Sequence, residues 1–340
     1  MRLLINSISD QTSWDQFILR HPEGGLLQSW AWGEFQTSLG NPIWRLRVVG
    51  DRDEILAQLL AVKLSLGFGK FIIYTPREVL INNTAPIQHQ RAAMELIVKK
   101  MKEIGTSEAA ILWRTDPPLK NSDTTALSIY KTMGFILSPK TIQPKTNWVL
   151  DITAGANNLL ASMRPKTRYN IRLAGKKGVR VAVSKNSEDI RIFNQLNQVT
   201  AARDGFTPHS DNYYKKQLET LGKNNTLELL IAYLGQTPVA AVLIACFGGQ
   251  ATYLHGASSS EYRETMANHA IQWAAIQAAQ AKGCTTYDFG GIDVVGQHPS
   301  WAGITRFKQG FGGRAVEYIG TLELPISPLW YRVYKILRGR

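Results

Sequence analysis

The chain of 340 residues is 44% hydrophobic and 19% charged, a composition that is ordinary for a globular protein and excludes a disordered polar segment. Its length is sufficient for two domains. With 39 Lys and Arg against 26 Asp and Glu, the net charge is +13, and this excess indicates a polyanionic partner such as RNA, a nucleotide-sugar phosphate or an anionic membrane surface.

Cys246 and Cys284 are the only cysteines of the chain, and both lie in apolar sequence surroundings. We therefore expect buried free thiols in a reducing cytoplasm, and no zinc site. No apolar run approaches the roughly 18 residues that span a membrane, and the N-terminus lacks a signal-peptide pattern. The sequence thus predicts a soluble cytoplasmic protein.

The first half of the chain reads as a mixed α/β unit. Apolar periodicity predicts helices over 13–20, 28–35 and 88–104. It predicts strands over 43–49, 55–63, 71–75 and 109–113. The segment Ala126–Phe135 then resembles the helix-to-strand ending of the Gcn5-related acetyltransferase fold.

The second half repeats this plan. The predicted strands cover 229–233, 239–247, 251–256 and 285–289, and the predicted helices cover 187–204 and 267–281. Tyr74 and Tyr253 lie in corresponding predicted strands, and Gly105 and Gly283 are predicted to end corresponding helices. The two tyrosines are separated by nearly the same number of residues as the two glycines. Two copies of one α/β unit are the simplest account.

Between the copies, residues 157–185 form the densest positive segment, and they include no acidic residue. Its cations include Arg164, Lys166, Arg168, Arg172, Lys176 and Lys177. Tyr169 and Ile171 alternate with them, as in a helix that docks by its apolar side and offers its charged side to phosphates. A basic helix that is merely solvated is the alternative.

The segment that follows the predicted helix 187–204 is a candidate binding loop. It contains a cation, Arg203, and a histidine, His209, and it leads into Tyr213. A single histidine in such a loop is more often a surface residue than a catalytic base, so we assign the binding role to Arg203 and Tyr213.

A glycine-rich stretch, Cys284–Gly313, suits neither a regular helix nor a uniformly packed strand. Gly290 and Gly291 are positioned to adopt positive φ or to let a ligand approach the backbone. Arg306 and Lys308 flank Phe307, and in a strand the two cations would share one face as a clamp for a phosphate or carboxylate. The alternative is a hairpin with structural glycines and solvated cations.

The last segment, which starts at Pro328, is predicted to be an amphipathic helix. Trp330, Val333, Tyr334 and Leu337 share one face, which we expect to pack onto the first domain. Contact with a membrane surface is the alternative role for this helix.

These motifs together resemble the Fem family of peptidoglycan interpeptide-bridge aminoacyltransferases. The motifs that carry the resemblance are Leu27–Gly33, Arg164–Arg172, Lys176–Val179, Tyr287–Ile292 and Gly303–Gly313. The resemblance implies an α/β fold of two tandem Gcn5-related acetyltransferase-like domains, with mixed sheets flanked by helices. It places the first domain at 1–150, completed by 315–340, and the second at 151–314, in a compact type without a coiled-coil arm.

The resemblance also implies the reaction: an amine of the stem peptide of a cell-wall precursor attacks the ester of aminoacyl-tRNA and forms an amide. Aminoacyl-tRNA is the co-substrate, and no metal or other cofactor is required. Lys308 matches the family motif as the catalytic charge, and Phe307 accompanies it. The implied substrate-binding residues are Arg306, Tyr253, His255, Arg203 and Tyr213, with Tyr253 and His255 facing one cleft. The basic segment would bind the tRNA.

The acceptor implied by the resemblance is UDP-MurNAc-pentapeptide or its lipid-linked form, used by a monomer in the cytoplasm or at the inner face of the membrane. One departure concerns the first domain, where Tyr74-Thr75-Pro76-Arg77 continues as Glu78-Val79, so that only Glu78 or Asp116 could replace the acidic substrate contact of the family. An acyl-CoA-dependent N-acyltransferase and a non-catalytic RNA-binding protein are the competing functions. The transferred amino acid is not predicted.

Overall fold

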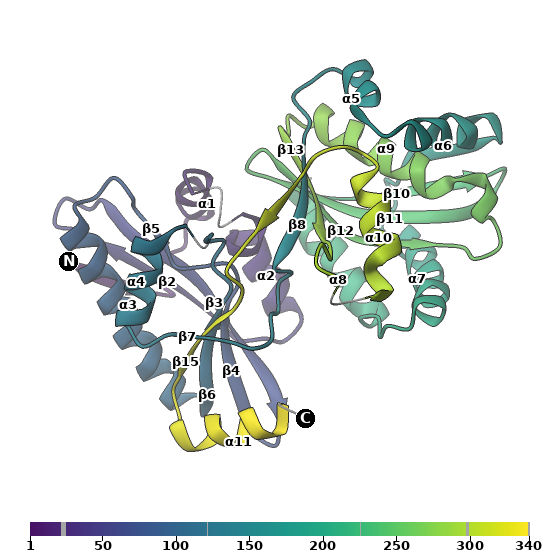
Figure 1. Ribbon diagram of the computed structural model, residues 1–340. Helices are drawn as coiled ribbons and strands as arrows, with labels where there is room; N and C mark the ends of the chain where they lie inside the picture. The colour runs from purple at the N-terminus through teal and green to yellow at the C-terminus, as the bar shows by residue number, and fades with distance from the viewer. Residues whose placement is uncertain (22–24, 121, 225, 297–298, 339–340) are drawn as a thin grey trace. The chain divides into compact units, whose positions relative to one another are not determined.

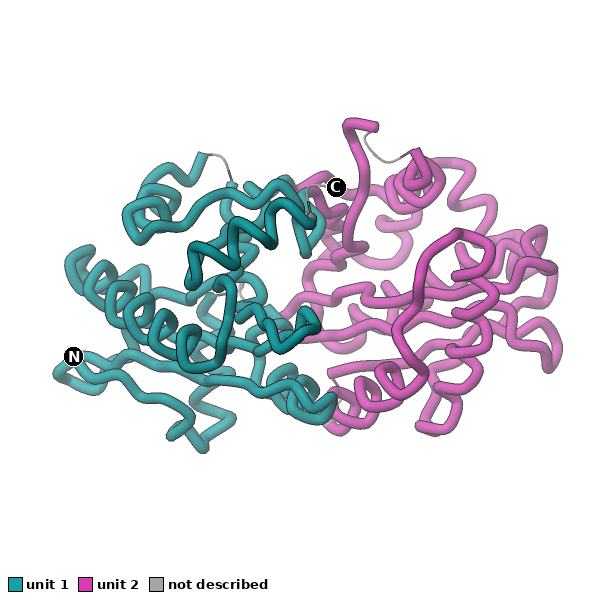
Figure 2. The backbone as a smooth tube through the Cα atoms, turned by 90° about the horizontal axis from the view of Figure 1, so that it is seen from below, with its two compact units in different colours: residues 1–145, 317–340 teal, residues 146–316 magenta. Residues whose placement is uncertain are grey.

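The computed structural model describes residues 1–21, 25–120, 122–224, 226–296 and 299–338. The chain forms two compact units, one of Met1–Lys145 with Glu317–Arg340 and one of Thr146–Val316 (Figure 2). The sequence placed the boundary at residue 150, inside what the structure shows to be a strand of unit 2, Thr146–Asp151. The chain returns to unit 1 at Glu317, whereas the sequence placed the return at residue 315.

Unit 1 is built on a mixed sheet in which, among the described residues, the strand order is β1-β2-β3-β4-β6-β15-β7, with β5 paired to β3 (Figure 1). The strands are β1 (Arg2–Ile5), β2 (Ile43–Val49), β3 (Ile55–Gly67), β4 (Lys70–Thr75), β5 (Leu80–Ile81), β6 (Ala110–Thr115), β7 (Ile136–Leu137) and β15 (Leu322–Pro325). The helices are α1 (Gln11–Leu19), α2 (Trp30–Ser38), α3 (Ile87–Ser107), α4 (Thr124–Thr132) and α11 (Pro328–Arg338).

Successive residues of β4 and β6 belong to two cores on opposite faces of this sheet, because the side chains of a strand alternate between its faces. Ile73 and Trp113 belong to the core that includes the buried side of α3. Ile72 and Leu112 belong to a smaller core that includes Tyr331 of α11. The helices α3 and α11 therefore cover opposite faces of the sheet of unit 1.

Unit 2 has a sheet whose strand order, among the described residues, is β14-β8-β13-β12-β11-β10-β9. The strands are β8 (Thr146–Asp151), β9 (Val179–Val183), β10 (Leu227–Leu234), β11 (Thr237–Phe247), β12 (Gln250–Ser258), β13 (Thr286–Gly291) and β14 (Arg314–Glu317). The helices are α5 (Ala156–Ser162), α6 (Pro165–Lys176), α7 (Ile190–Asp204), α8 (Asp211–Leu221), α9 (Ala267–Ala281) and α10 (Ala302–Gln309).

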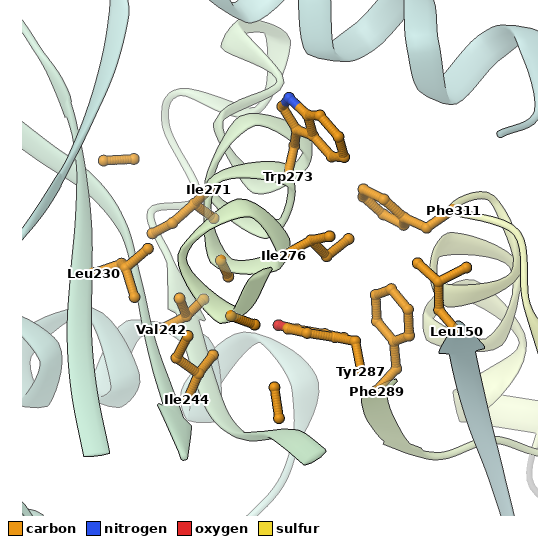
Figure 3. Packing of buried hydrophobic residues seen from close by; sticks show 14 of the residues in the cluster. Leu150, Leu230, Val242, Ile244, Ile271, Trp273, Ile276, Tyr287, Phe289 and Phe311 are labelled. Atoms are coloured by element: carbon orange, nitrogen blue, oxygen red, sulfur yellow. The ribbon is translucent and has the colours of Figure 1, made fainter. Parts of the chain in front are cut away.

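The helix α9 covers one face of this sheet, and α7 and α8 lie on the other. Figure 3 shows Ile276 of α9 pointing toward Tyr287 and Phe289 of β13 and toward Phe311 after α10. These side chains are buried, so they form the centre of the core of unit 2.

The predicted repeat is present. Each sheet contains one parallel strand pair that is connected by a helix: β4 and β6 by α3 in unit 1, and β12 and β13 by α9 in unit 2. The other pairs whose register the structure describes, which leave out β8 with β14, run antiparallel. The prediction of two tandem α/β domains with mixed sheets is confirmed. Across the described ranges, no helix is long and apolar enough to cross a membrane.

Candidate active site

The segment with Arg306 and Lys308 forms the short helix α10 rather than the strand that the alternating pattern suggested. Residues two apart point in nearly opposite directions on a helix, so the expected clamp of two cations on one face is wrong. Arg306 is exposed, whereas only 7% of Lys308 is accessible. The helix α10 ends at Gln309, and Gly310 is its C-terminal cap.

The buried ammonium group of Lys308 is held between α10 and the end of β13. Its Nζ donates a hydrogen bond to the carbonyl oxygen of Gly291 over 2.6 Å. Burial lowers the pKa of Lys308 to about 8, and the nearby carboxylate of Asp288 acts in the opposite direction. Lys308 is therefore mostly protonated at pH 7, and it loses its proton as the pH rises through about 8.

Asp288 is the partner charge that the sequence did not single out. It is 3% exposed and accepts hydrogen bonds from the side-chain amide of Asn147 at 2.8 Å and from the backbone N–H of Gly290 at 2.7 Å. Those bonds keep the carboxylate fixed beside Lys308. Its place inside the stretch Tyr287–Ile292 was the only sequence signal for it.

Gly290 lies between the lysine and the neighbouring strand. Its φ of +74° is in the left-handed region, as expected, whereas Gly291 is not among the positive-φ glycines. A Cβ at Gly290 would lie 3.9 Å from Lys308 Nζ and 3.9 Å from the carbonyl oxygen of Tyr253. The amine of Lys308 and the backbone of β12 therefore both border the space beside Gly290.

This position coincides with the point where the two parallel strands stop pairing. Their register ends at Thr252 opposite Asp288, although β12 continues to Ser258 and β13 to Gly291. Beyond that point β12 still pairs with β11 on its other side. Lys308 thus lies where the ends of β12 and β13 no longer pair with each other. An extended substrate can approach the backbone of either strand there.

Tyr253 and His255 do not face one cleft, contrary to the prediction. A bulge in β12 leaves Leu254 out of the register, so that Tyr253 lies opposite Ile244 while His255 lies opposite Leu243. Because Ile244 and Leu243 are consecutive residues of β11, their partners point to opposite faces of the sheet. Alternation over 251–256 could not reveal the extra residue.

Tyr253 lies along its own strand, over Gly256. A Cβ at Gly256 would be 2.6 Å from Cζ of Tyr253, so the ring can occupy this position only when residue 256 is a glycine. Burial raises the pKa of Tyr253 to about 12, so the phenol stays protonated and can act as a hydrogen-bond donor.

We expect a Gly256→Ala variant to lose about 1–3 kcal/mol of unfolding free energy because the added methyl group displaces the ring of Tyr253. Urea denaturation measures the loss. In a Tyr253→Ala background the same substitution should cost little, because the obstructing ring is gone. Equal costs in the two backgrounds would contradict the described packing.

On the opposite face, His255 belongs to an aromatic cluster with residues around α8. His209 stacks on Tyr213 with ring centroids 4.0 Å apart, and the rings of Tyr214 and His255 are 5.1 Å apart. Burial, followed by the neighbouring His209, lowers the pKa of His255 to about 3, and burial also lowers the pKa of His209. Both histidines are therefore neutral near pH 7.

A separate cavity of about 300 Å³ lies where β12 leads into α9. Arg203, Arg263, His269 and Phe307 line it, whereas Tyr213 does not. Arg203 forms two hydrogen bonds with Asp204, of 2.7 and 2.9 Å, and also bonds to Ser258. The structure therefore joins Arg203 with Phe307 and Tyr213 with His255, in two groups rather than one.

The basic segment forms α6, and its cations are largely on the outside. Arg164, Lys166, Arg172, Lys176 and Lys177 are exposed, and Arg168 is partly buried and donates to the carbonyl oxygens of Ala161 and Met163. Arg168 therefore also has a structural role.

The docking side of α6 consists of Thr167, Asn170 and Ala174, which are buried at helical spacing. Ile171 packs against the core as expected. Tyr169 was expected on that side but is 62% exposed, because it lies between Lys166 and Arg172 on the outer face. This correction places an aromatic ring among the cations.

In unit 1, the two acidic candidates have different surroundings. Asp116 is buried and accepts a hydrogen bond from Thr321. Burial of Tyr74, together with the nearby charge of Asp116, raises the pKa of Tyr74 well above its usual value. Glu78 lines a cavity of about 630 Å³ together with Tyr130. Asp116 and Tyr74 lie at the carboxyl ends of the parallel pair of unit 1.

Comparisons with solved structures define the class of fold. The chain resembles the crystal structure of FemX with a TM-score of 0.83 at 22% identity, covering 100% of both chains. It also resembles a tandem GNAT protein from the clavulanic acid biosynthesis pathway, with a TM-score of 0.59 at 11% identity over 96% of this chain and 99% of that one. The fold is therefore that of the two-domain acyltransferase-like proteins.

Sequence comparison gives the family. The FemAB family model matches residues 129–235 and 233–338, and the chain belongs to the FemAB family. Among its relatives, the lipid II:glycine glycyltransferase of Staphylococcus saprophyticus is 27% identical, over 98% of this chain and 96% of the relative. The corresponding protein of Staphylococcus epidermidis is 25% identical over 95% of this chain and 93% of the relative.

Proposed function

We propose that this protein transfers an amino acid from aminoacyl-tRNA to an amine on the stem peptide of a lipid-linked peptidoglycan precursor, as a monomer at the inner face of the membrane. The observation that carries the proposal is the buried amine of Lys308 beside the unpaired ends of β12 and β13. The relatives named as lipid II:glycine glycyltransferases support the acceptor class, and they make glycine the first amino acid to test.

In the proposed reaction the neutral acceptor amine attacks the ester carbonyl of aminoacyl-tRNA. A C–N bond forms, the ester C–O bond breaks, and the amine proton leaves with the ribose oxygen of the tRNA. The ester supplies the driving force, so the reaction as proposed needs no metal or further cofactor. The ammonium of Lys308 stabilises the negative oxygen of the tetrahedral intermediate, and it does so in a dry site whose geometry is already set by Gly291 and Asp288.

The proposed tRNA contact is the exposed face of α6. Its cations can neutralise phosphates while Thr167, Asn170 and Ala174 fix the helix to unit 2. The backbone N–H of Arg164 also bonds to the carbonyl oxygen of Gly310, at 2.9 Å, so the start of α6 is connected directly to the end of α10. A tRNA on this helix would therefore lie next to the segment that carries Lys308.

The pKa of Lys308 gives a pH prediction. Only the protonated amine stabilises the oxyanion, so kcat/KM should fall as pH rises through about 8, with the loss of one proton. A Lys308→Arg variant keeps its charge in this range, so whatever activity it retains should lack that limb. An identical alkaline limb in the two proteins would assign the titration to another group.

The experiment that tests the proposed function measures transfer of radiolabelled amino acids from a charged tRNA pool to lipid-linked precursor in vesicles and, separately, to UDP-MurNAc-pentapeptide. Wild type, Lys308→Ala and the exposed-lysine control Lys99→Ala are compared. Labelling that requires Lys308 but not Lys99 supports the proposal and identifies the acceptor. Salt-dependent tRNA binding without labelling would favour an RNA-binding protein, and absence of tRNA binding would favour an acyl-CoA donor.

A further inference from the structure

The inner side of α11 is fixed to the sheet of unit 1 by a buried polar network. Tyr331 donates a hydrogen bond of 2.7 Å to Glu323, and Glu323 is also paired with Arg114. Arg114 in turn donates to the hydroxyl of Tyr334 over 2.9 Å. Both charged residues of the ion pair are almost completely buried, so this side of the helix is committed to the fold.

Of the residues of α11 that were predicted to pack onto the first domain, Tyr334 does so, but Trp330, Val333 and Leu337 are exposed. The packing residues are Tyr331 and Tyr334, whereas an apolar row at helical spacing points outward. Its members, with their exposed fractions, are Leu329 at 69%, Trp330 at 43%, Val333 at 36%, Ile336 at 66% and Leu337 at 69%. We refer to this set as the outer row.

A second exposed apolar group adjoins the outer row. The turn between β3 and β4 carries Phe68, whose side chain is fully exposed, between Gly67 and Gly69. The next residue, Lys70, places its Nζ 4.1 Å from the centre of the ring of Trp330. Figure 1 shows α11 crossing the sheet at the end where β4 and β6 begin. The turn and the helix therefore form one surface of unit 1.

The charges around this surface are positive. Arg332 and Lys335 are exposed on α11, Lys335 with its Nζ 5.8 Å from the centre of the Tyr331 ring, and Lys70 lies at the base of the turn. The helix Pro328–Arg338 contains no acidic residue. An apolar row bordered by cations, with an aromatic ring at a turn tip, has the chemistry of a helix that lies in the interface of an anionic bilayer.

We propose that the outer row and Phe68 insert into the headgroup region of an anionic phospholipid bilayer, with Lys70, Arg332 and Lys335 contacting lipid phosphates. The inference rests on the proposed function in one respect, since docking of unit 1 would bring the enzyme to a lipid-linked acceptor. The surface itself is defined by the exposed fractions and charges of its own residues, without reference to catalysis.

The test is co-sedimentation of the full chain with vesicles of phosphatidylcholine alone and of phosphatidylcholine with phosphatidylglycerol, without tRNA or precursor. An outer-row variant carries Leu329→Ser, Ile336→Ser and Phe68→Ser. A matched control carries Leu19→Ser and Ile87→Ser, two residues of unit 1 that are about half exposed on α1 and α3. A third variant reverses Lys70, Arg332 and Lys335 to Glu.

Wild type and control should bind the anionic vesicles, and the outer-row variant should bind at least tenfold more weakly. The charge-reversed variant should lose about a hundredfold on anionic vesicles, and added salt should weaken the wild type. Equal binding by the outer-row variant and its control, or no binding by the wild type, would overturn the proposal. Sedimentation velocity that shows a dimer abolished by the outer-row variant would instead assign the surface to a second copy.

Transfer assays separate this inference from the proposed function. The outer-row variant should label UDP-MurNAc-pentapeptide as wild type does but should label vesicle-bound precursor poorly. If wild type labels neither acceptor, the vesicle measurements still decide the docking proposal, because they require no catalysis.

Discussion

A Lys308→Ala enzyme is expected to show a kcat about 10²–10³ times lower than wild type, with little change in the KM of either substrate. The variant removes the ammonium group that donates a hydrogen bond to the carbonyl oxygen of Gly291, at the unpaired ends of the parallel strands. In that water-excluded position, a charge acts mainly on the transition state, so the loss should appear in kcat. Steady-state transfer from purified aminoacyl-tRNA measures it.

Two comparisons make this prediction specific. Lys99→Ala, on the exposed side of α3, should have wild-type kinetics. Asp288→Asn should raise the fraction of neutral Lys308, because the carboxylate favours the charged amine, and the alkaline limb should move to lower pH. A Lys308→Ala variant with normal kcat and raised KM would show that the lysine binds substrate and does not stabilise the transition state.

A Gly313→Ala chain is expected to lose at least about 3 kcal/mol of unfolding free energy. Gly313 has a φ of +98°, and an added Cβ would lie 2.5 Å from the carbonyl oxygen of Val149 in β8. Both the backbone conformation and the contact exclude a side chain, and the obstructing atom belongs to a strand that cannot swing aside. Urea denaturation followed by tryptophan fluorescence measures the loss.

The matched control for this prediction is Gly303→Ala. Gly303 lies in α10, ten residues earlier in the same stretch, and a Cβ there would meet no atom within 4 Å. Alanine favours the helix over glycine, so this variant should be as stable as wild type or more stable by up to about 1 kcal/mol. Similar stabilities of the two variants would mean that the segment after α10 is not held against β8.

Much of the architecture could be predicted from the sequence because the signals were local. Apolar periodicity located α3 and α9, and their equivalent positions in the chain predicted the duplication. Gly283 follows the end of α9 as predicted, but Gly105 does not end α3, which continues to Ser107. The exposed cations of α6 also followed from composition, since so dense a positive segment has no partners to neutralise it in the interior.

The failures concern features that short patterns do not determine. The alternation Arg306-Phe307-Lys308 fits a strand, but the eight residues Ala302–Gln309 form a helix whose inner side buries Thr305 and Lys308. The bulge at Leu254 places Tyr253 and His255 on opposite faces of the sheet, and nothing in the amino-acid types marks such a one-residue shift. The partnership of Asp288 with Lys308 required knowledge of the folded chain.

The ion pair between Arg114 and Glu323 also has a consequence for biosynthesis. These residues are 209 positions apart, and β15, which carries Glu323, lies between β6 and β7 in the sheet of unit 1. A ribosome that has made all of unit 1 up to Lys145 has not yet made this strand, so Arg114 lacks its counter-charge and β6 presents an open edge. Unit 1, most of which is translated first, must therefore wait until β15, Leu322–Pro325, has been made before it can finish folding.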